Sequence, residues 1–90
     1  MQQPLPYCVH ILRSQKDGDL YIGYTTDLAQ RLQQHMTGQN RSTAPRCPLD
    51  LVFCEFFRSA EGAQRRERYL KTSPGKRGLK LMLRGTLPPT

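Results

Sequence analysis

The chain has 90 residues, enough for one domain with one hydrophobic core but not for a separate recognition module. Fourteen Lys and Arg against seven Asp and Glu give a formal net charge of +7, which favours a polyanionic partner such as nucleic acid. No run approaches the roughly 18 apolar residues of a membrane span, and the start lacks the features of a signal peptide. We therefore expect a cytoplasmic protein that does not enter a membrane.

The cysteines are Cys8, Cys47 and Cys54, an odd number without any C-x-x-C spacing. This pattern indicates neither a disulfide framework nor a zinc ribbon, and it fits a reducing compartment. A zinc site can be imagined from these three residues and His10, but the spacings do not match paired zinc ligands.

The first part of the chain predicts a β-hairpin. Residues 7–13 and 20–24 favour strands, and Asp17-Gly18 between them is a hairpin signal. A two-residue loop at Asp17-Gly18 sets Leu12 opposite Gly23 and Ser14 opposite Tyr21. Four side chains should then share one face of the sheet: His10, Leu12, Tyr21 and Gly23.

A helix is expected over roughly residues 27–37, with Thr26 and Asp27 as its N-terminal cap and Gly38 at its end. Its apolar stripe consists of Leu28, Leu32 and Met36. Arg31 and His35 lie four residues apart on one flank of this stripe, where they can act together at the boundary between core and water.

The next segments predict a polar, basic surface loop over residues 38–48 and then a strand over residues 51–57. The strand is apolar on both faces apart from Glu55. This pattern is typical of a strand buried within a sheet, so we expect it to be the central one.

Ser59 can cap a second helix whose inward stripe is Ala60, Ala63, Glu67 and Leu70. An ionised carboxylate on such a stripe requires a positive partner. An ion pair of Glu67 with Arg31 or Arg66 satisfies this requirement, and so does a metal ion held by Glu67 with water and phosphate.

After a break at residues 72–75, a third helix is expected over residues 76–84, with Leu79, Met82 and Leu83 at helical spacing. Residues 84–90 should form a flexible tail. The prediction is a single α/β domain of the α+β type, with its core at about 7–83 and the order β-β-α-β-α-α.

Several residues could carry phosphodiester chemistry. Tyr21, His10 and His35 could handle a proton, Arg31 could hold a phosphate oxygen and Glu67 could bind a divalent metal. Each also has an ordinary structural interpretation, as a strand aromatic, a surface or packed imidazole, or one half of an ion pair. The expected DNA-binding residues are Arg41, Arg46, Arg65, Lys71, Lys76 and Arg77. A basic surface that only keeps the protein soluble is the alternative interpretation of these charges.

These residues together resemble the GIY-YIG nuclease family. The resemblance rests on Tyr7 to Arg13, on the run from Leu20 to Leu28, on Arg31-x-x-x-His35 and on Ala63-x-x-Arg66-Glu67-x-x-Leu70-Lys71. It covers residues of about 7–83 and is closest to the small stand-alone bacterial members.

The resemblance implies a three-stranded antiparallel sheet flanked by helices and cleavage of DNA with Mg²⁺ or Mn²⁺. It further implies that Tyr21 activates water, that Arg31 steadies the phosphoryl group, that Glu67 holds the metal and that His35 occupies a position where the family uses histidine or tyrosine. Selectivity for DNA structure, a link to repair or recombination, and specificity from DNA shape or a partner protein are further expectations.

The sequence departs from the family at one signature position. The first motif is Cys8-Val9-His10, so histidine replaces the usual tyrosine. An imidazole can still hydrogen-bond and accept a proton. Two alternatives therefore stand beside the nuclease: a non-catalytic nucleic-acid-binding domain and a protein-interaction adaptor, which should expose a sizeable apolar patch.

Overall fold

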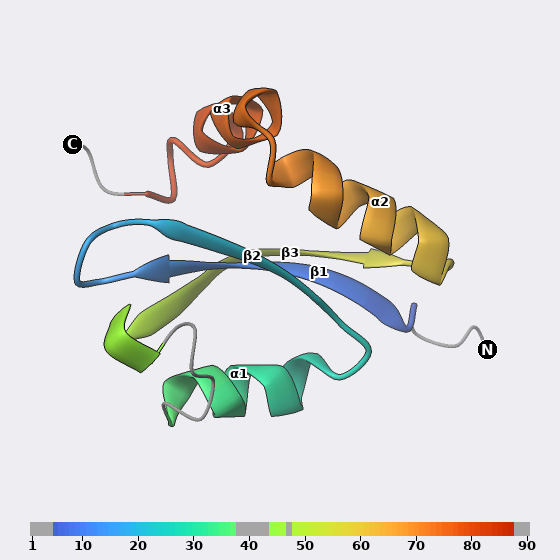
Figure 1. Ribbon diagram of the computed structural model, residues 1–90, viewed down its shortest axis with the longest axis horizontal. Coiled ribbons are helices and arrows are strands. Elements are labelled where there is room, and N and C mark those ends of the chain that lie inside the picture. Colours follow the sequence, from blue (N-terminus) through green and yellow to red (C-terminus); the bar gives the residue numbers. More distant parts are fainter. Residues whose placement is uncertain (1–4, 38–43, 47, 88–90) are drawn as a thin grey trace.

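The computed structural model describes residues 5–37, 44–46 and 48–87. Its elements follow in the order β-β-α-β-α-α, with a short 3-10 helix before the third strand (Figure 1). Their bounds are β1 Tyr7–Ser14, β2 Leu20–Thr25, α1 Leu28–Met36, η1 Ala44–Arg46, β3 Leu49–Phe57, α2 Ala60–Leu70 and α3 Ser73–Met82. The expected order and α+β class are confirmed.

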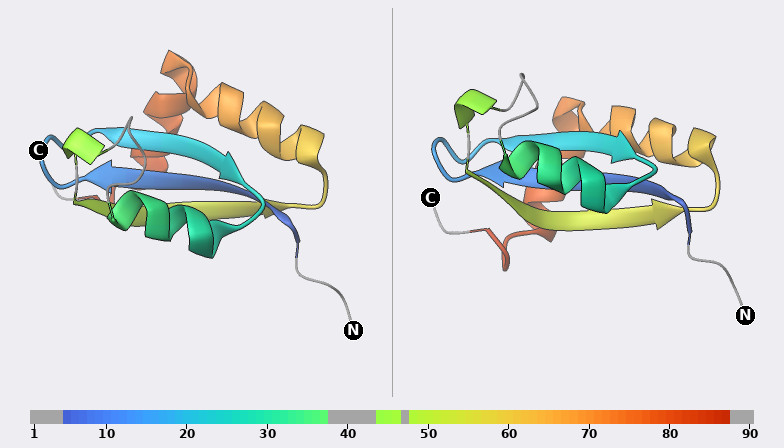
Figure 2. Two further views of the ribbon diagram at one scale, coloured as in Figure 1. Left: turned by 60° about the horizontal axis from the view of Figure 1, so that its bottom comes forward. Right: turned by 90° about the horizontal axis from the view of Figure 1, so that it is seen from below.

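The three strands form an antiparallel sheet in the order β2-β1-β3, with helices on both faces. Helix α1 covers one face, and α2 with α3 covers the other (Figures 1 and 2). Strand β1 is therefore central, so the prediction that residues 51–57 form the central strand was wrong. Leu51 is 41% exposed and Phe56 47% exposed. A continuous apolar run does not by itself distinguish a central strand from an edge strand.

The hairpin was predicted correctly, but its register was not. Leu12 pairs with Tyr21 and His10 with Gly23, two residues away from the predicted pairing. The connection is longer than two residues, because β1 ends at Ser14 and β2 begins at Leu20. Gly18 supplies the left-handed conformation in this turn, with φ of 78°. A shift by two residues keeps each side chain on its predicted face, whereas a shift by one would reverse it.

The face of the sheet below α2 and α3 carries the apolar core. Val9 and Ile11 of β1 are fully buried there, together with Ala63 and Leu70 of α2 and Leu79 of α3. Alternation along β1 places Cys8, His10, Leu12 and Ser14 on the opposite face, towards α1, and all four are buried. The central strand is thus enclosed on both sides.

The helices begin where the sequence predicts, with one exception. The Asp27 carboxylate accepts from the Gln30 amide at 3.1 Å, and the Ser59 hydroxyl accepts from the Gly62 amide at 3.1 Å. Helix α3 begins at Ser73, earlier than expected, because the Thr72 hydroxyl caps it by accepting from the Gly75 amide at 3.2 Å. The break predicted at residues 72–75 is therefore its first turn.

Gly75 also lets the start of α3 pack closely against the end of α2. A Cβ atom at this position would overlap the Tyr69 carbonyl oxygen and lie 2.8 Å from the Leu70 Cα.

Two apolar residues expected in helix stripes face water instead, since Met36 is 75% exposed and Met82 50% exposed. Leu87, in the segment expected to be a tail, packs against the core.

Candidate functional site

The face of the sheet towards α1 holds two imidazoles in contact range. The rings of His10 on β1 and His35 on α1 have centroids 6.1 Å apart and are tilted by 59°. His10 is 2% exposed and His35 6% exposed, so His35 lies deeper than the predicted boundary between core and water. Within the described residues, the buried Nδ1 of His10 has no hydrogen-bond partner.

Gly23 makes room for the His10 ring. The two residues are direct partners across β1 and β2, and a Cβ atom at position 23 would lie 2.7 Å from the His10 Nε2 and 2.8 Å from its Cε1. No side chain can occupy this position unless the imidazole moves. Gly23, the last residue of the Tyr21-Ile22-Gly23 motif, is thus sterically coupled to His10, the residue that departs from the first motif.

Both imidazoles are held in the neutral form. Burial, with smaller contributions from the nearby His35 and Arg31 in the same direction, lowers the pKa of His10 to about 4. Burial and Arg31 also lower the pKa of His35. Arg31 is therefore electrostatically coupled to both rings, so the structure groups three of the predicted site residues.

Tyr21 lies on the edge strand β2, opposite Leu12 and on the same face as His10. It is half-buried and lines a surface hollow together with Lys71 and Lys76. Of the groups predicted to handle a proton, the phenol is more accessible to solvent than either imidazole.

Glu67 lies on α2, which packs over β1 and β2. Its side chain is 21% exposed, and its Oε2 accepts from the Lys71 Nζ at 3.3 Å. The expected ion pair with Arg31 or Arg66 is not formed: Arg66 donates instead to the Glu55 Oε1 at 2.9 Å. Lys71 lies four residues after Glu67, so this pair could have been predicted from the i,i+4 spacing in the sequence.

A comparison with protein families places these residues in context. The model of the GIY-YIG catalytic domain matches residues 6–80. The chain belongs to the GIY-YIG family. This membership supports a nuclease domain with a DNA substrate, and GIY-YIG nucleases generally use divalent metals.

Relatives of this GIY-YIG protein include small bacterial proteins. It is 39% identical over 71 residues to a UPF0213 protein of Staphylococcus saprophyticus, which covers 78% of this chain and 87% of the relative. A UPF0213 protein of Streptococcus agalactiae is 40% identical over 68 residues, covering 74% of this chain and 76% of the relative. The solution NMR structure of the UPF0213 protein BH0048 from Bacillus halodurans is 36% identical, covers 89% of this chain and 86% of that chain, and has a TM-score of 0.56. No helix among the described residues could cross a membrane.

The donor set of this GIY-YIG domain fits a hard divalent cation with few protein ligands. No group of three or more His, Cys, Asp and Glu capable of holding a metal occurs among residues 5–37, 44–46 and 48–87. Glu67 presents a partly exposed carboxylate, and Mg²⁺ binds readily through one or two carboxylates with water and substrate phosphate. The fit to a magnesium-type ion therefore rests on one residue.

A soft-metal site has less support. Cys8 and Cys54 are free thiols, and burial together with the neighbouring Cys54 raises the pKa of the Cys8 thiol to about 11. A thiol held in its protonated form is a poor ligand for zinc. Cys47 lies outside the described residues.

Two of the predicted DNA-binding residues, Lys71 and Lys76, line one surface hollow. Lys76 and Arg77 are exposed on α3, whereas Arg65 on α2 pairs with Glu61 at 2.9 Å. Arg41 lies outside the described residues, and for Arg46 only its place in η1 is described. The predicted set omits Lys80 and Arg84, which follow Lys76 by four and eight residues in the sequence.

Proposed function

We propose that this protein is a divalent-metal-dependent DNA endonuclease that hydrolyses phosphodiester bonds. The observation that carries the proposal is the group formed by His10, His35 and Arg31 beside Gly23, on the face that also presents Tyr21. Membership of the GIY-YIG family supports the same activity. Selectivity for branched or flapped DNA and a connection with repair or recombination belong to the proposal as well.

Tyr21 and Arg31 are the residues proposed to contact the substrate. Tyr21 takes a proton from the attacking water, because it is the most accessible of the proton-handling groups. The guanidinium of Arg31 holds a non-bridging phosphate oxygen and stabilises the charge that develops at phosphorus. Arg31 is half-buried, which strengthens this interaction relative to bulk water.

His10 and His35 act as positioning residues. A ring that is 2% exposed, with a pKa lowered to about 4, is badly placed and too weak a base to activate water near neutral pH. Two neutral rings beside Arg31 add no competing positive charge at the phosphate site. His10 therefore replaces the family's tyrosine as a packed polar group rather than as the base.

Glu67 is the residue proposed to hold the metal ion. A divalent ion supplies charge stabilisation for the transferring phosphate and the leaving oxygen when it is bound. Lys71 pairs with Glu67 and borders the same hollow as Tyr21.

The alternative is a nucleic-acid-binding domain without cleavage. The unpartnered His10 Nδ1 favours it, because a buried polar atom without a partner among the described residues is a departure from an optimised site. This alternative predicts salt-sensitive DNA binding that is independent of metal ions.

The test is cleavage of end-labelled duplex, single-stranded, flapped and branched DNA with Mg²⁺ or Mn²⁺. Glu67→Gln should abolish cutting while DNA affinity and fold are retained, and Tyr21→Phe should reduce it strongly. Glu61→Gln, on an exposed part of the same helix, is the matched control and should cut at the parent rate. All variants are purified identically so that a contaminating nuclease appears in every preparation.

Cutting by the parent that persists in Glu67→Gln would remove this residue from the mechanism. Binding without cutting on any substrate would establish the alternative function, and His10→Tyr is then the variant to examine for restored activity. A preference among the four DNA structures would identify the substrate class.

A further inference from the structure

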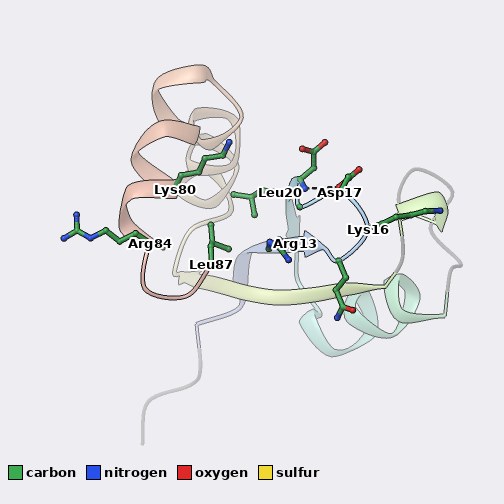
Figure 3. Close-up of a pocket in the computed structure, with 10 residues that line it drawn as sticks. Arg13, Lys16, Asp17, Leu20, Lys80, Arg84 and Leu87 are labelled. Atoms are coloured by element: carbon green, nitrogen blue, oxygen red, sulfur yellow. Dashed lines mark hydrogen bonds between the residues drawn. The ribbon is translucent and has the colours of Figure 1, made fainter. Parts of the chain in front are cut away.

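Two neighbouring surface hollows between the β-hairpin and α3 share lining residues and together form one basic surface. The first is lined by residues of the hairpin turn and by residues at and after the end of α3 (Figure 3). The second is lined by Asp19, Leu20, Tyr21 and Ile22 at the edge strand β2 and by Lys71, Lys76 and Lys80. Asp19, Leu20 and Lys80 line both hollows. We call the combined surface the β2–α3 groove; its cationic residues are Arg13, Lys16, Lys71, Lys76, Lys80 and Arg84.

The charge in this groove is unbalanced. Six cations face two carboxylates, Asp17 and Asp19. Asp17 is engaged within the turn, where its Oδ1 accepts from the Asp19 amide at 2.9 Å. Lys71 pairs with Glu67 at 3.3 Å and Lys16 donates to the Pro45 carbonyl at 3.2 Å. Lys76, Lys80 and Arg84 therefore dominate the positive electrostatic potential on the α3 side of the groove.

Lys76, Lys80 and Arg84 follow one another at intervals of four residues and are all exposed. In the part of the chain that the structure describes, none of the three forms an ion pair. Figure 3 shows Lys80 directed towards the hairpin and Arg84 extending outward beyond the end of α3. Lys76 and Lys80, four residues apart, share one face of α3, and Arg84 lies in the turn that follows the helix.

The spacing of these cations suits a nucleic-acid backbone. Lys76 and Lys80 are separated by four helical residues, a rise of about 6 Å, which corresponds to about two nucleotide steps of a B-DNA strand that advances about 3.4 Å per nucleotide. We infer that the β2–α3 groove carries one nucleic-acid strand away from Tyr21, its phosphates bound by Lys76, Lys80 and Arg84. The backbone phosphates are contacted without base readout, so binding shows little sequence preference.

The test measures DNA affinity over a range of salt concentrations for the full chain. Changing Lys76, Lys80 and Arg84 together to Gln should weaken binding of a fluorescent duplex roughly tenfold and reduce the slope of log affinity against log salt by about 2.7. The matched control, compared with the pair Lys76→Gln and Lys80→Gln, changes Arg58 and Arg68 to Gln. These exposed residues remove the same charge but do not line the groove, and the slope should stay close to that of the parent.

A groove variant that binds as the parent does, or a control variant that loses as much affinity, would overturn the inference. The first outcome places the strand elsewhere, and the second reduces the effect to net charge. Lys80→Glu is a single-site check, because Lys80 lines both hollows and its reversal should exceed the effect of Arg68→Glu.

The inference rests on the proposed function only for the position of the cleavage site. Cleavage assays distinguish a failure of the groove from a failure of the proposed endonuclease. At saturating protein concentration the groove variant should still cut DNA, because its defect is in binding. Glu67→Gln should bind DNA and not cut it. Loss of cutting at saturation, with the protein folded, would contradict the groove as a binding surface alone. If the parent never cuts but the groove variant loses its salt slope, the groove stands and the proposed endonuclease fails.

Discussion

The two faces of the central strand β1 are both buried but chemically different. Towards α2 and α3, β1 contributes Val9 and Ile11 to a core formed by aliphatic side chains. Towards α1, the same strand buries Cys8 and His10, and every buried polar residue of the described chain is on this side or at its hairpin end: His10, Ser14, Thr25 and His35. One face thus stabilises the fold, and the other holds polar groups whose burial is unfavourable unless they serve a purpose.

This comparison has a physical lesson. Apolar burial contributes about 25 cal/mol per Å² without directional requirements, so the α2–α3 face can tolerate conservative changes of shape. The α1 face depends on particular distances, such as those between the His10 ring and position 23. Substitutions on the two faces should therefore separate stability from activity.

The largest effect is expected on the apolar face. Leu70→Ala removes a side chain that is 1% exposed and should destabilise the protein by about 2–5 kcal/mol, measured by urea unfolding. Cleavage per folded molecule should stay near the parent value at low temperature. Leu81→Ala, at a position 62% exposed, is the control and should change stability by less than about 0.5 kcal/mol. Equal losses from both substitutions would contradict the assigned core.

The second effect is a dependence of stability on pH that originates on the α1 face. The folded-state pKa of His10 is lowered from 6.5 to about 4, so the unfolded chain binds more protons between these values. Stability should be fully present above pH 6.5 and fall as the pH drops towards 4, by up to about 3 kcal/mol from His10. His10→Phe should flatten this part of the curve in unfolding experiments across pH. An unchanged pH profile in His10→Phe would show that the ring is not responsible.

Gly23→Ala should produce a smaller loss of stability but a clear loss of activity. The new methyl group would lie 2.7 Å from the His10 Nε2, and overpacking of this kind costs about 1–3 kcal/mol. The displaced ring should disturb His35 and Arg31 and thereby reduce kcat. In the double variant His10→Ala/Gly23→Ala, the additional loss of stability caused by Gly23→Ala should largely disappear, because the two changes are coupled. Additive effects would mean that position 23 acts independently of His10.

The smallest effect concerns a polar pair on the apolar side. Glu55→Gln weakens the contact to Arg66 at 2.9 Å, where the side chains are 34% and 27% exposed for Arg66 and Glu55. Solvent screening limits the loss to under about 1 kcal/mol, and it should shrink further in high salt. Cleavage should not change. A salt-independent loss would indicate packing rather than charge.

Local signals predicted much of the fold correctly. Ser59 and Asp27 cap the helices as expected, because a short oxygen-bearing side chain satisfies the free amides of the first turn. The face assignment of His10 and Tyr21 also holds, since side-chain alternation survives an error of two residues in register. The central strand was misassigned because apolar content does not encode which neighbours a strand pairs with.

The site was predicted as a set of residue types rather than as an arrangement. The structure brings His10 to His35 and Arg31, and it assigns Lys71 rather than an arginine as the partner of Glu67. The roles of Tyr21, Arg31 and Glu67 in cleavage stay predictions. Gly23 as the space for His10 was missed, because a steric requirement across two strands is visible only once their register is known.

By itself, the sequence determined the α+β class, the order of elements, the basic character and the motif residues of a GIY-YIG domain. These follow from local propensity, periodicity and spacing, which act over a few neighbouring residues. Only the tertiary structure decided that β1 is central, that the two histidines are buried and neutral, and that the cations of α3 border a groove that Tyr21 also lines. Those properties depend on the packing of segments distant in the chain, where desolvation and steric exclusion set the outcome.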